Sequence, residues 1–280
     1  MLDKDFNINK EPTWNSAIED IVSLYLKERY ALTLAELDDL YGCKLCAWVT
    51  KIKNIDFNFV DAYNSQTVKF VAQEMNDNYV YAFEGMDFKP GDVVIDIGAN
   101  VGMVSIYLAK RYPFLKIYSY EPVLLNFENL KRNLERNSIP EGIITAERFA
   151  VTADGRPVSL KTCIGNTGGS QFADHAGNGF VQKSVDINVP SITLEEIIKK
   201  HDIKKIKLLK IDCEGAEHEI LYNCPTKILK KIEYLRGEFH ENHNIKWGGG
   251  SVDKLVEYCD KYIKDMYITE CNPFKITIPL

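Results

Sequence analysis

The feature that most constrains the fold is a continuous β-branched run at residues 93–97, which leads through Gly98 into a helical stretch. Such a run predicts a strand buried on both faces, as in a parallel sheet. Apolar runs then alternate with amphipathic stretches, which is typical of β-α units around one sheet. The expected strands are residues 93–97, 115–120, 143–151, 206–211 and 234–239, followed by an antiparallel closing pair at 266–269 and 274–278. We therefore expect an α/β domain over residues 81–280.

The first 80 residues have a different pattern. Apolar residues from Trp14 to Tyr25 fall at helical spacing, and Thr33 with Glu36 has the spacing of a capping box. The segments 47–52 and 67–71 are short and ambiguous. We expect residues 1–80 to form a mostly helical extension rather than an independent domain.

Composition excludes several classes of protein. The net charge of −6 argues against a sequence-independent hold on nucleic acid. No apolar stretch approaches the ~20 residues of a membrane span, and the first residues lack the apolar core of a signal peptide. The seven cysteines are odd in number and scattered, which suits a reducing compartment. We expect a cytoplasmic protein that does not bind nucleic acid and does not span a membrane.

The turn after the first strand has the sequence Gly-Ala-Asn-Val-Gly, from Gly98 to Gly102. Glycines there let the backbone approach a ligand closely, at the amino end of a helix with free N–H groups. The spacing is not the G-x-G-x-x-G of dinucleotide enzymes. Asp96 stands two residues before Gly98, where an acid suits a cofactor with a cationic end. A glycine-rich turn without a ligand is the alternative.

Acidic residues also end two other expected strands. Glu121 follows the second strand, where a carboxylate accepts hydrogen bonds from ribose hydroxyls, unless it is a surface group. Asp212 ends the strand at 206–211, which should neighbour the first strand because the order reverses there in a doubly wound sheet. Asp212 is then expected to face the same crevice as Asp96. Glu214 and Glu217 add charge beyond it, and we assign Glu217 to the start of the next helix.

Taken in order, these segments resemble the FkbM family of S-adenosylmethionine-dependent methyltransferases. The resemblance covers roughly residues 83–245, and its matching segments are residues 92–102, 120–133, 149–151, 193–198, 210–221 and 238–240. It implies the Rossmann-like class I methyltransferase fold, a doubly wound seven-stranded sheet with an antiparallel last strand. It also implies S-adenosyl-L-methionine as cofactor and methyl transfer to a hydroxyl of a sugar, a glycan or a small secondary metabolite.

The resemblance also implies roles for individual residues. Asp212 would lie near the amino group and the reactive methyl of the cofactor. Glu121 would bind the ribose, flanked by Pro122 and Val123. The methionine moiety would be held by Asp96, Gly98, Asn100 and Gly102, and the adenine slot would be lined by Ala150 and Val151.

Methyl transfer to a hydroxyl also needs a group that accepts the hydroxyl proton. His240 ends the fifth strand, beside the fourth, and imidazole is a suitable base near neutral pH. Asp212 and Glu238 are alternative bases, and His240 bonded only to backbone is a further possibility. The residues 238–243 with Asp212 could instead bind a divalent metal, but we expect the alternation of strand side chains to scatter these groups, so no metal is predicted.

Two other functions compete with this prediction. The first is N-methylation of nucleic acid, whose enzymes resemble one another in an Asn/Asp-Pro-Pro-Tyr/Phe motif. Here the corresponding strand ends in Asp212-Cys213-Glu214, which argues against that activity. The second is a catalytically silent scaffold that binds the cofactor without consuming it. The sequence favours a small-molecule or glycan acceptor and does not indicate an oligomeric state.

Overall fold

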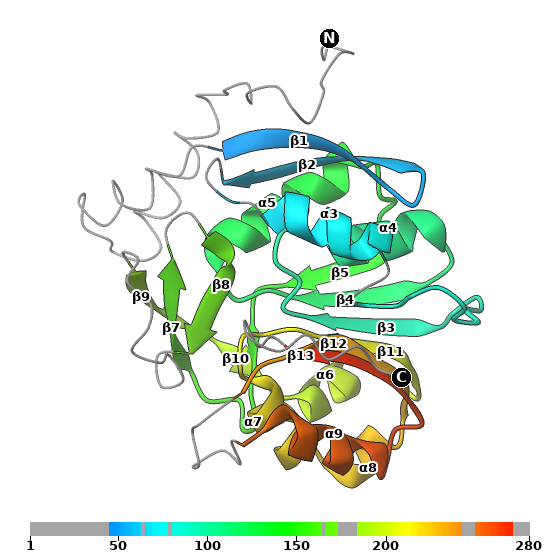
Figure 1. Ribbon diagram of the computed structural model, residues 1–280, viewed down its shortest axis with the longest axis vertical. Helices are drawn as coiled ribbons and strands as arrows, with labels where there is room; N and C mark the ends of the chain where they lie inside the picture. The colour runs from blue at the N-terminus through cyan, green and yellow to red at the C-terminus, as the bar shows by residue number, and fades with distance from the viewer. Residues whose placement is uncertain are drawn as a thin grey trace.

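A computed structural model describes residues 45–62, 65, 67–77, 80–163, 166–172, 184–241 and 250–270. Its central sheet has six parallel strands in the order β13-β12-β11-β3-β4-β5 (Figure 1). Because β3 has β4 on one side and β11 on the other, the strand order reverses there, and the doubly wound α/β architecture is confirmed. The strands are β3 Val93–Ile97, β4 Lys116–Tyr120, β5 Ile144–Glu147, β11 Ile206–Ile211, β12 Ile232–Phe239 and β13 Asp265–Glu270.

Helices cover both faces of this sheet (Figure 1). A hydrophobic core lies on each face of the sheet. Val94 of β3 belongs to the core on one face, and the next residue, Ile95, belongs to the core on the other. Both side chains are fully buried, as the β-branched run predicts. One face carries α3 Thr67–Asp77, α4 Met103–Arg111 and α5 Leu124–Arg136, and the other carries α6 Leu194–Lys200, α7 Glu217–Asn223, α8 Thr226–Leu229 and α9 Val252–Asp260.

The closing strands differ in part from the expectation. The expected strand at 266–269 lies within β13, which pairs with β12 in parallel. Its expected antiparallel partner, residues 274–278, lies outside the described residues, so a seventh, antiparallel strand stays a prediction. Within the part of the chain that the structure describes, no helix is both long and apolar enough to cross a membrane.

The third expected strand, residues 143–151, is divided in two. After β5 the chain leaves the sheet, and the short β6 Ala150–Val151 pairs in parallel with β10 Ser191–Ile192. A separate antiparallel sheet in the order β8-β7-β9 follows, formed by β7 Val158–Cys163, β8 Asn166–Phe172 and β9 Ser184–Val189. Because β6 leaves the edge of the central sheet, Ala150 and Val151 lie in the wall of the cavity at the carboxyl ends of the strands.

The prediction of a mostly helical extension is wrong for its described part. Strands β1 Leu45–Ile52 and β2 Ile55–Ala62 form an antiparallel hairpin, and only α3 is helical there. Phe57 and Phe59 alternate inward along β2 and are buried in the same core as Val94 of the central sheet. The hairpin therefore gains its stability from packing on α4 and α5, which a short local pattern does not reveal. The helices expected between residues 14 and 42 lie outside the described residues.

Two asparagines one turn apart, Asn133 in α5 and Asn137 immediately after it, attach this hairpin to the rest of the protein. The buried side chain of Asn133 accepts from the Val60 amide at 2.6 Å and donates to the Val60 carbonyl at 3.1 Å. It also donates to the Val101 carbonyl at 2.8 Å. Asn137 repeats the two backbone contacts at Asn58, at 3.1 and 2.8 Å. The side-chain amides of Asn133 and Asn137 pair with the backbone of alternate residues of β2. They therefore satisfy the free edge of β2 as a neighbouring strand would.

We predict that Asn133→Ala destabilises the protein by roughly 2–5 kcal/mol, because each buried group left unpaired costs about 1–3 kcal/mol. Urea denaturation followed by circular dichroism measures the change. Lys131→Ala, at an exposed position of the same helix, is the control and should shift stability by less than about 0.5 kcal/mol. Equal effects of the two substitutions would contradict the role given to Asn133.

Candidate active site

A cavity of about 250 Å³ opens at the carboxyl ends of the parallel strands, beside the point where their order reverses. Ligands bind at this position in open α/β sheets. Most of the predicted site residues line it, namely Gly98, Asn100, Glu121, Pro122, Val123, Ala150, Val151, Asp212 and Glu238. Within the described residues, the predicted residues that are not part of its wall are Asp96, Gly102 and His240.

Gly98 is required where the β3 turn meets the end of β11. Its φ is +75°, and a Cβ at this position would lie 1.9 Å from the carbonyl oxygen of Asp212. Gly102 caps α4 with a φ of +87° and packs under Leu130, so its part is to shape the turn rather than to line the cavity. The resemblance implied that both glycines hold the cofactor, and only Gly98 reaches the cavity.

Glu121 is held in the cavity wall by three hydrogen bonds to its carboxylate. Its carboxylate accepts hydrogen bonds from the backbone amides of Asn100 at 2.8 Å and Val123 at 2.9 Å, and from the side chain of Asn126 at 3.3 Å. It is only 4% exposed, and burial raises its pKa to about 7, although the hydrogen bonds lower it. These contacts exclude a loose surface carboxylate and fix both oxygens at the cavity edge.

Asp96 faces a cation of the chain itself. Its buried carboxylate lies 3.2 Å from the Lys210 ammonium and accepts a hydrogen bond from Ser105 at 2.6 Å. Lys210 is 2% exposed, donates to the carbonyl of Gly98 at 2.7 Å and lies 3.9 Å from Asp212. Although burial lowers it, the pKa of Lys210 is raised by these two carboxylates. The prediction that Asp96 contacts a cationic ligand therefore changes: Asp96 holds Lys210, and Lys210 supports the turn at Gly98.

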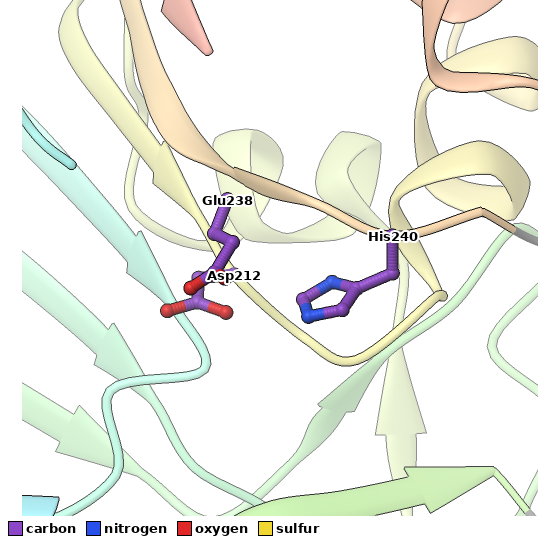
Figure 2. Close-up of side chains that lie close together, drawn as sticks. All are labelled: Asp212, Glu238 and His240. Atoms are coloured by element: carbon purple, nitrogen blue, oxygen red, sulfur yellow. The ribbon is translucent and has the colours of Figure 1, made fainter. Parts of the chain in front are cut away.

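The far end of the cavity is acidic. Asp212 accepts a hydrogen bond from the Tyr81 hydroxyl at 2.9 Å, and Glu238 of β12 lies beside it. The imidazole of His240 extends toward these two carboxylates, and their ligand atoms lie within 4.8 Å of one another (Figure 2). The expectation that strand alternation would scatter these groups is wrong, because Glu238 and His240 are two residues apart and share one face.

This convergence does not by itself make a metal site. One ring nitrogen of His240 lies 3.3 Å from the carboxylate of Glu217, and the other lies 3.4 Å from that of Glu214. Asp212 is already engaged by Tyr81 and faces Lys210. The contacts thus satisfy these groups within the chain, and we assign no metal to them.

His240 is an ion-pair partner of the turn after β11. The fully buried Glu217 accepts from the amides of Cys213 at 2.8 Å and Gly215 at 2.9 Å. Burial raises the pKa of Glu217, but His240 and these amides outweigh it and hold the pKa below its usual value. Glu217 does begin α7, as predicted, and it also anchors His240. The carbonyl of His240 contacts the ring of His218 at 2.9 Å.

Sequence reasoning missed several residues of the cavity. Lys210 stands inside a matched segment, and a lysine at the end of a strand that was expected to be buried was the available signal. Tyr81 had no local signal, because its partner Asp212 is remote in sequence. One face of α3 also lines the cavity, and its members are Thr67, Phe70, Val71 and Glu74. Their spacing is helical, but the segment 67–71 was too short for its pattern to distinguish a helix from a strand.

The fold and this cavity place the chain among the α/β proteins whose ligand site lies at the carboxyl edge of a doubly wound sheet. The family model described as "Methyltransferase FkbM domain" matches residues 96–267, and the chain belongs to this family. It is therefore an enzyme of the methyltransferase class, as the resemblance implied.

Characterised relatives share this region at low identity. The chain is 24% identical over 201 residues to the 31-O-demethyl-FK506 methyltransferase FkbM of Streptomyces tacrolimicus, covering 64% of this chain and 76% of the relative. It is 28% identical over 176 residues to methyltransferase sdnD of Sordaria araneosa, covering 55% and 67%. It is also 22% identical over 151 residues to the hexuronic acid methyltransferase AglP of Haloferax volcanii, covering 53% and 56%.

We predict that Lys210→Met lowers the free energy of unfolding by about 3–5 kcal/mol at pH 7, because it leaves Asp96 buried without its cation. Chemical denaturation measures the loss. Lys205→Met, at the exposed residue just before the same strand, removes an ion pair to Glu233 and should cost no more than about 1 kcal/mol. A Lys210→Met protein as stable as the Lys205→Met control would refute the buried ion pair as a support of the site.

Proposed function

We propose that this protein is an S-adenosylmethionine-dependent O-methyltransferase that acts on a hydroxyl of a sugar, a glycan or a small secondary metabolite. The observation that carries the proposal is the position of Glu121, whose carboxylate lines the cavity one strand away from the Gly98 turn. The relatives named for 31-O-demethyl-FK506 and for hexuronic acid support an oxygen acceptor.

The described wall fits the parts of S-adenosylmethionine. Glu121 would accept from the ribose hydroxyls, flanked by Pro122 and Val123, and the turn at Gly98 and Asn100 would hold the methionine moiety. The apolar residues Phe149, Ala150 and Val151 would line the adenine slot. When bound, the cofactor supplies a methyl group on a positively charged sulfur, which keeps the electron pair of the broken C–S bond. The carboxylate of Asp212, which is part of the cavity wall, would favour that positive charge.

A carboxylate is a better candidate than His240 for the base that accepts the proton of the acceptor hydroxyl. The ring of His240 is held between Glu214 and Glu217 and is not part of the cavity wall, whereas Asp212 and Glu238 are. We therefore assign His240 the task of fixing the loop after β11, and we place the acceptor hydroxyl at the acidic end of the cavity. There the chain must align the oxygen with the methyl group and remove a proton.

Isothermal titration calorimetry tests the cofactor. We expect S-adenosylmethionine to bind and NAD or NADP not to bind, because the turn lacks the dinucleotide spacing. Glu121→Gln should weaken binding roughly 10- to 150-fold, the effect of about 1.5–3 kcal/mol for a lost charge-assisted hydrogen bond. The affinity of the wild-type protein should fall as pH decreases through about 7, where Glu121 takes up a proton.

The matched control is Glu147→Gln. Glu147 ends the neighbouring strand β5 and pairs with Lys200 outside the cavity wall, so this variant should bind the cofactor normally. Tight binding of NAD with no heat from S-adenosylmethionine would overturn the proposed cofactor. Unchanged affinity in Glu121→Gln would remove Glu121 from the ribose site.

Mass spectrometry then tests the reaction class. The protein is incubated with S-adenosylmethionine and, separately, with hexoses, hexuronic acids, alkyl glycosides and RNA. We expect a mass gain of one methyl group on a hydroxyl compound and no methylation of RNA. Cofactor binding without consumption with any acceptor would favour a silent scaffold, and methylated RNA bases would favour the nucleic acid alternative.

A further inference from the structure

The helix α3 lies outside the family region at residues 96–267, yet it forms a wall of the cavity. Its residues Thr67, Phe70, Val71 and Glu74 recur at helical spacing and all line the cavity. The opposite face, Val68, Ala72 and Met75, is buried in the core shared with the central sheet. The helix is thus held firmly on one side and presents its other side to the ligand space.

Glu74 is the acidic member of this wall. The groups that face it are the carboxylates of Asp212 and Glu238, the ammonium of Lys210 and the hydroxyl of Tyr81. They come from β11 and its end, from β12 and from the segment before β3, so Glu74 lies opposite the strand ends that the sequence singled out. Burial, and then the like charges of Glu238 and Asp212, raise the pKa of Glu74 to about 7, although Lys210 lowers it.

The acids at this end of the cavity differ in how well their charge is stabilised. Asp212 accepts a hydrogen bond from Tyr81 and lies 3.9 Å from Lys210, so a donor and a cation stabilise its negative charge. Tyr81 keeps its own proton, because burial and then the charges of Asp212 and Glu74 raise its pKa well above the ordinary value. Glu74 meets two carboxylates, and a proton placed on it relieves this repulsion.

We propose that Glu74 is the catalytic base of this enzyme, and that α3 supplies the acceptor-binding wall. This inference rests on the proposed function and names its acceptor side. The O–H bond of the acceptor breaks, the proton passes to the Glu74 carboxylate, and the electron pair stays on the oxygen. That oxygen would form the new bond to the methyl carbon as the methyl–sulfur bond breaks, and the electron pair of that bond would stay on the cofactor sulfur. Atoms and charges then balance with the acceptor, the cofactor and Glu74 alone.

The rest of the α3 wall indicates the class of acceptor. Phe70 and Val71 are apolar, and Phe70 is 56% exposed beside the cavity, an unusual position for a large aromatic side chain. An aromatic side chain next to an acid suits an acceptor that has both a sugar hydroxyl and an apolar group. The acid would contact the hydroxyl and the aromatic ring would contact the apolar group. Octyl β-glucoside has both parts and serves as the acceptor probe.

The main test is Glu74→Gln, which keeps the size of the side chain but cannot accept a proton. Turnover with octyl β-glucoside should fall about 10²–10⁴-fold, while S-adenosylmethionine affinity measured by calorimetry stays unchanged. At saturating S-adenosylmethionine, where the titration of Glu121 no longer limits binding, the wild-type rate should rise with pH through about 7 as Glu74 loses its proton, and this limb should disappear in the variant. Asp77→Asn, an exposed carboxylate on the same helix, is the control and should behave as wild type.

A second measurement needs no bound cofactor. The pKa of Glu74 is near its ordinary value of 4.5 in the unfolded chain, and burial raises it to about 7 in the folded protein. Between these values the folded state binds more protons, so wild-type stability relative to Glu74→Gln should fall as pH rises from about 4.5 to 7 and then level off. Thermal unfolding at a series of pH values records this difference, which Asp77→Asn should not show.

Each outcome decides the proposal. Glu74→Gln that keeps more than a tenth of the wild-type rate, or a stability difference independent of pH, would overturn Glu74 as the base. Wild-type protein that binds S-adenosylmethionine but leaves octyl β-glucoside unmodified would overturn the acceptor wall. Failure of the wild-type protein to bind S-adenosylmethionine would instead remove the proposed function itself, so the two failures are distinguishable.

Discussion

The site depends on one buried lysine. Lys210 sits inside a parallel sheet with 2% of its surface exposed, where an unpaired ammonium would be strongly unfavourable. Asp96 and Asp212 stabilise its charge from the neighbouring strand and from the end of its own, and the Gly98 carbonyl completes its contacts. The close approach of β3 and β11 requires Gly98, since a Cβ there would meet the carbonyl of Asp212. Charge pairing and steric fit therefore fix the floor of the cavity together.

The cavity is lined both by the family region, residues 96–267, and by α3, which precedes that region. Strand ends of the central sheet provide Glu121, Asp212 and Glu238, while α3 closes the opposite side. That helix packs on a hairpin whose edge is hydrogen-bonded to Asn133 of α5 and to Asn137, the residue that follows α5. In the proposed function, the residues assigned to the donor lie within the family region, whereas the wall assigned to the acceptor includes residues that precede it.

Local patterns predicted the parts of the site that are fixed locally. The run before Gly98 and the acids that end β4 and β11 were placed correctly, because strand, turn and helix follow one another along the chain. The contact between Asp96 and Lys210 was not anticipated, because the two residues are remote in sequence although their strands are neighbours in the sheet. The hairpin and the inward face of α3 were missed because tertiary packing determines them. The scattering expected for Glu238 and His240 was an error of strand periodicity, since residues two apart share a face.

The most direct test of the account is a crystal structure of the protein with S-adenosylhomocysteine, the demethylated cofactor. The account predicts the ribose hydroxyls on the Glu121 carboxylate, the adenine beside Ala150 and Val151, and the sulfur facing the space between Asp212 and α3. Unchanged contacts between Lys210, Asp96 and Asp212 should accompany binding. A ligand bound elsewhere, or one whose sulfur faces away from α3 with Glu121 contacting only the chain's own amides, would contradict it.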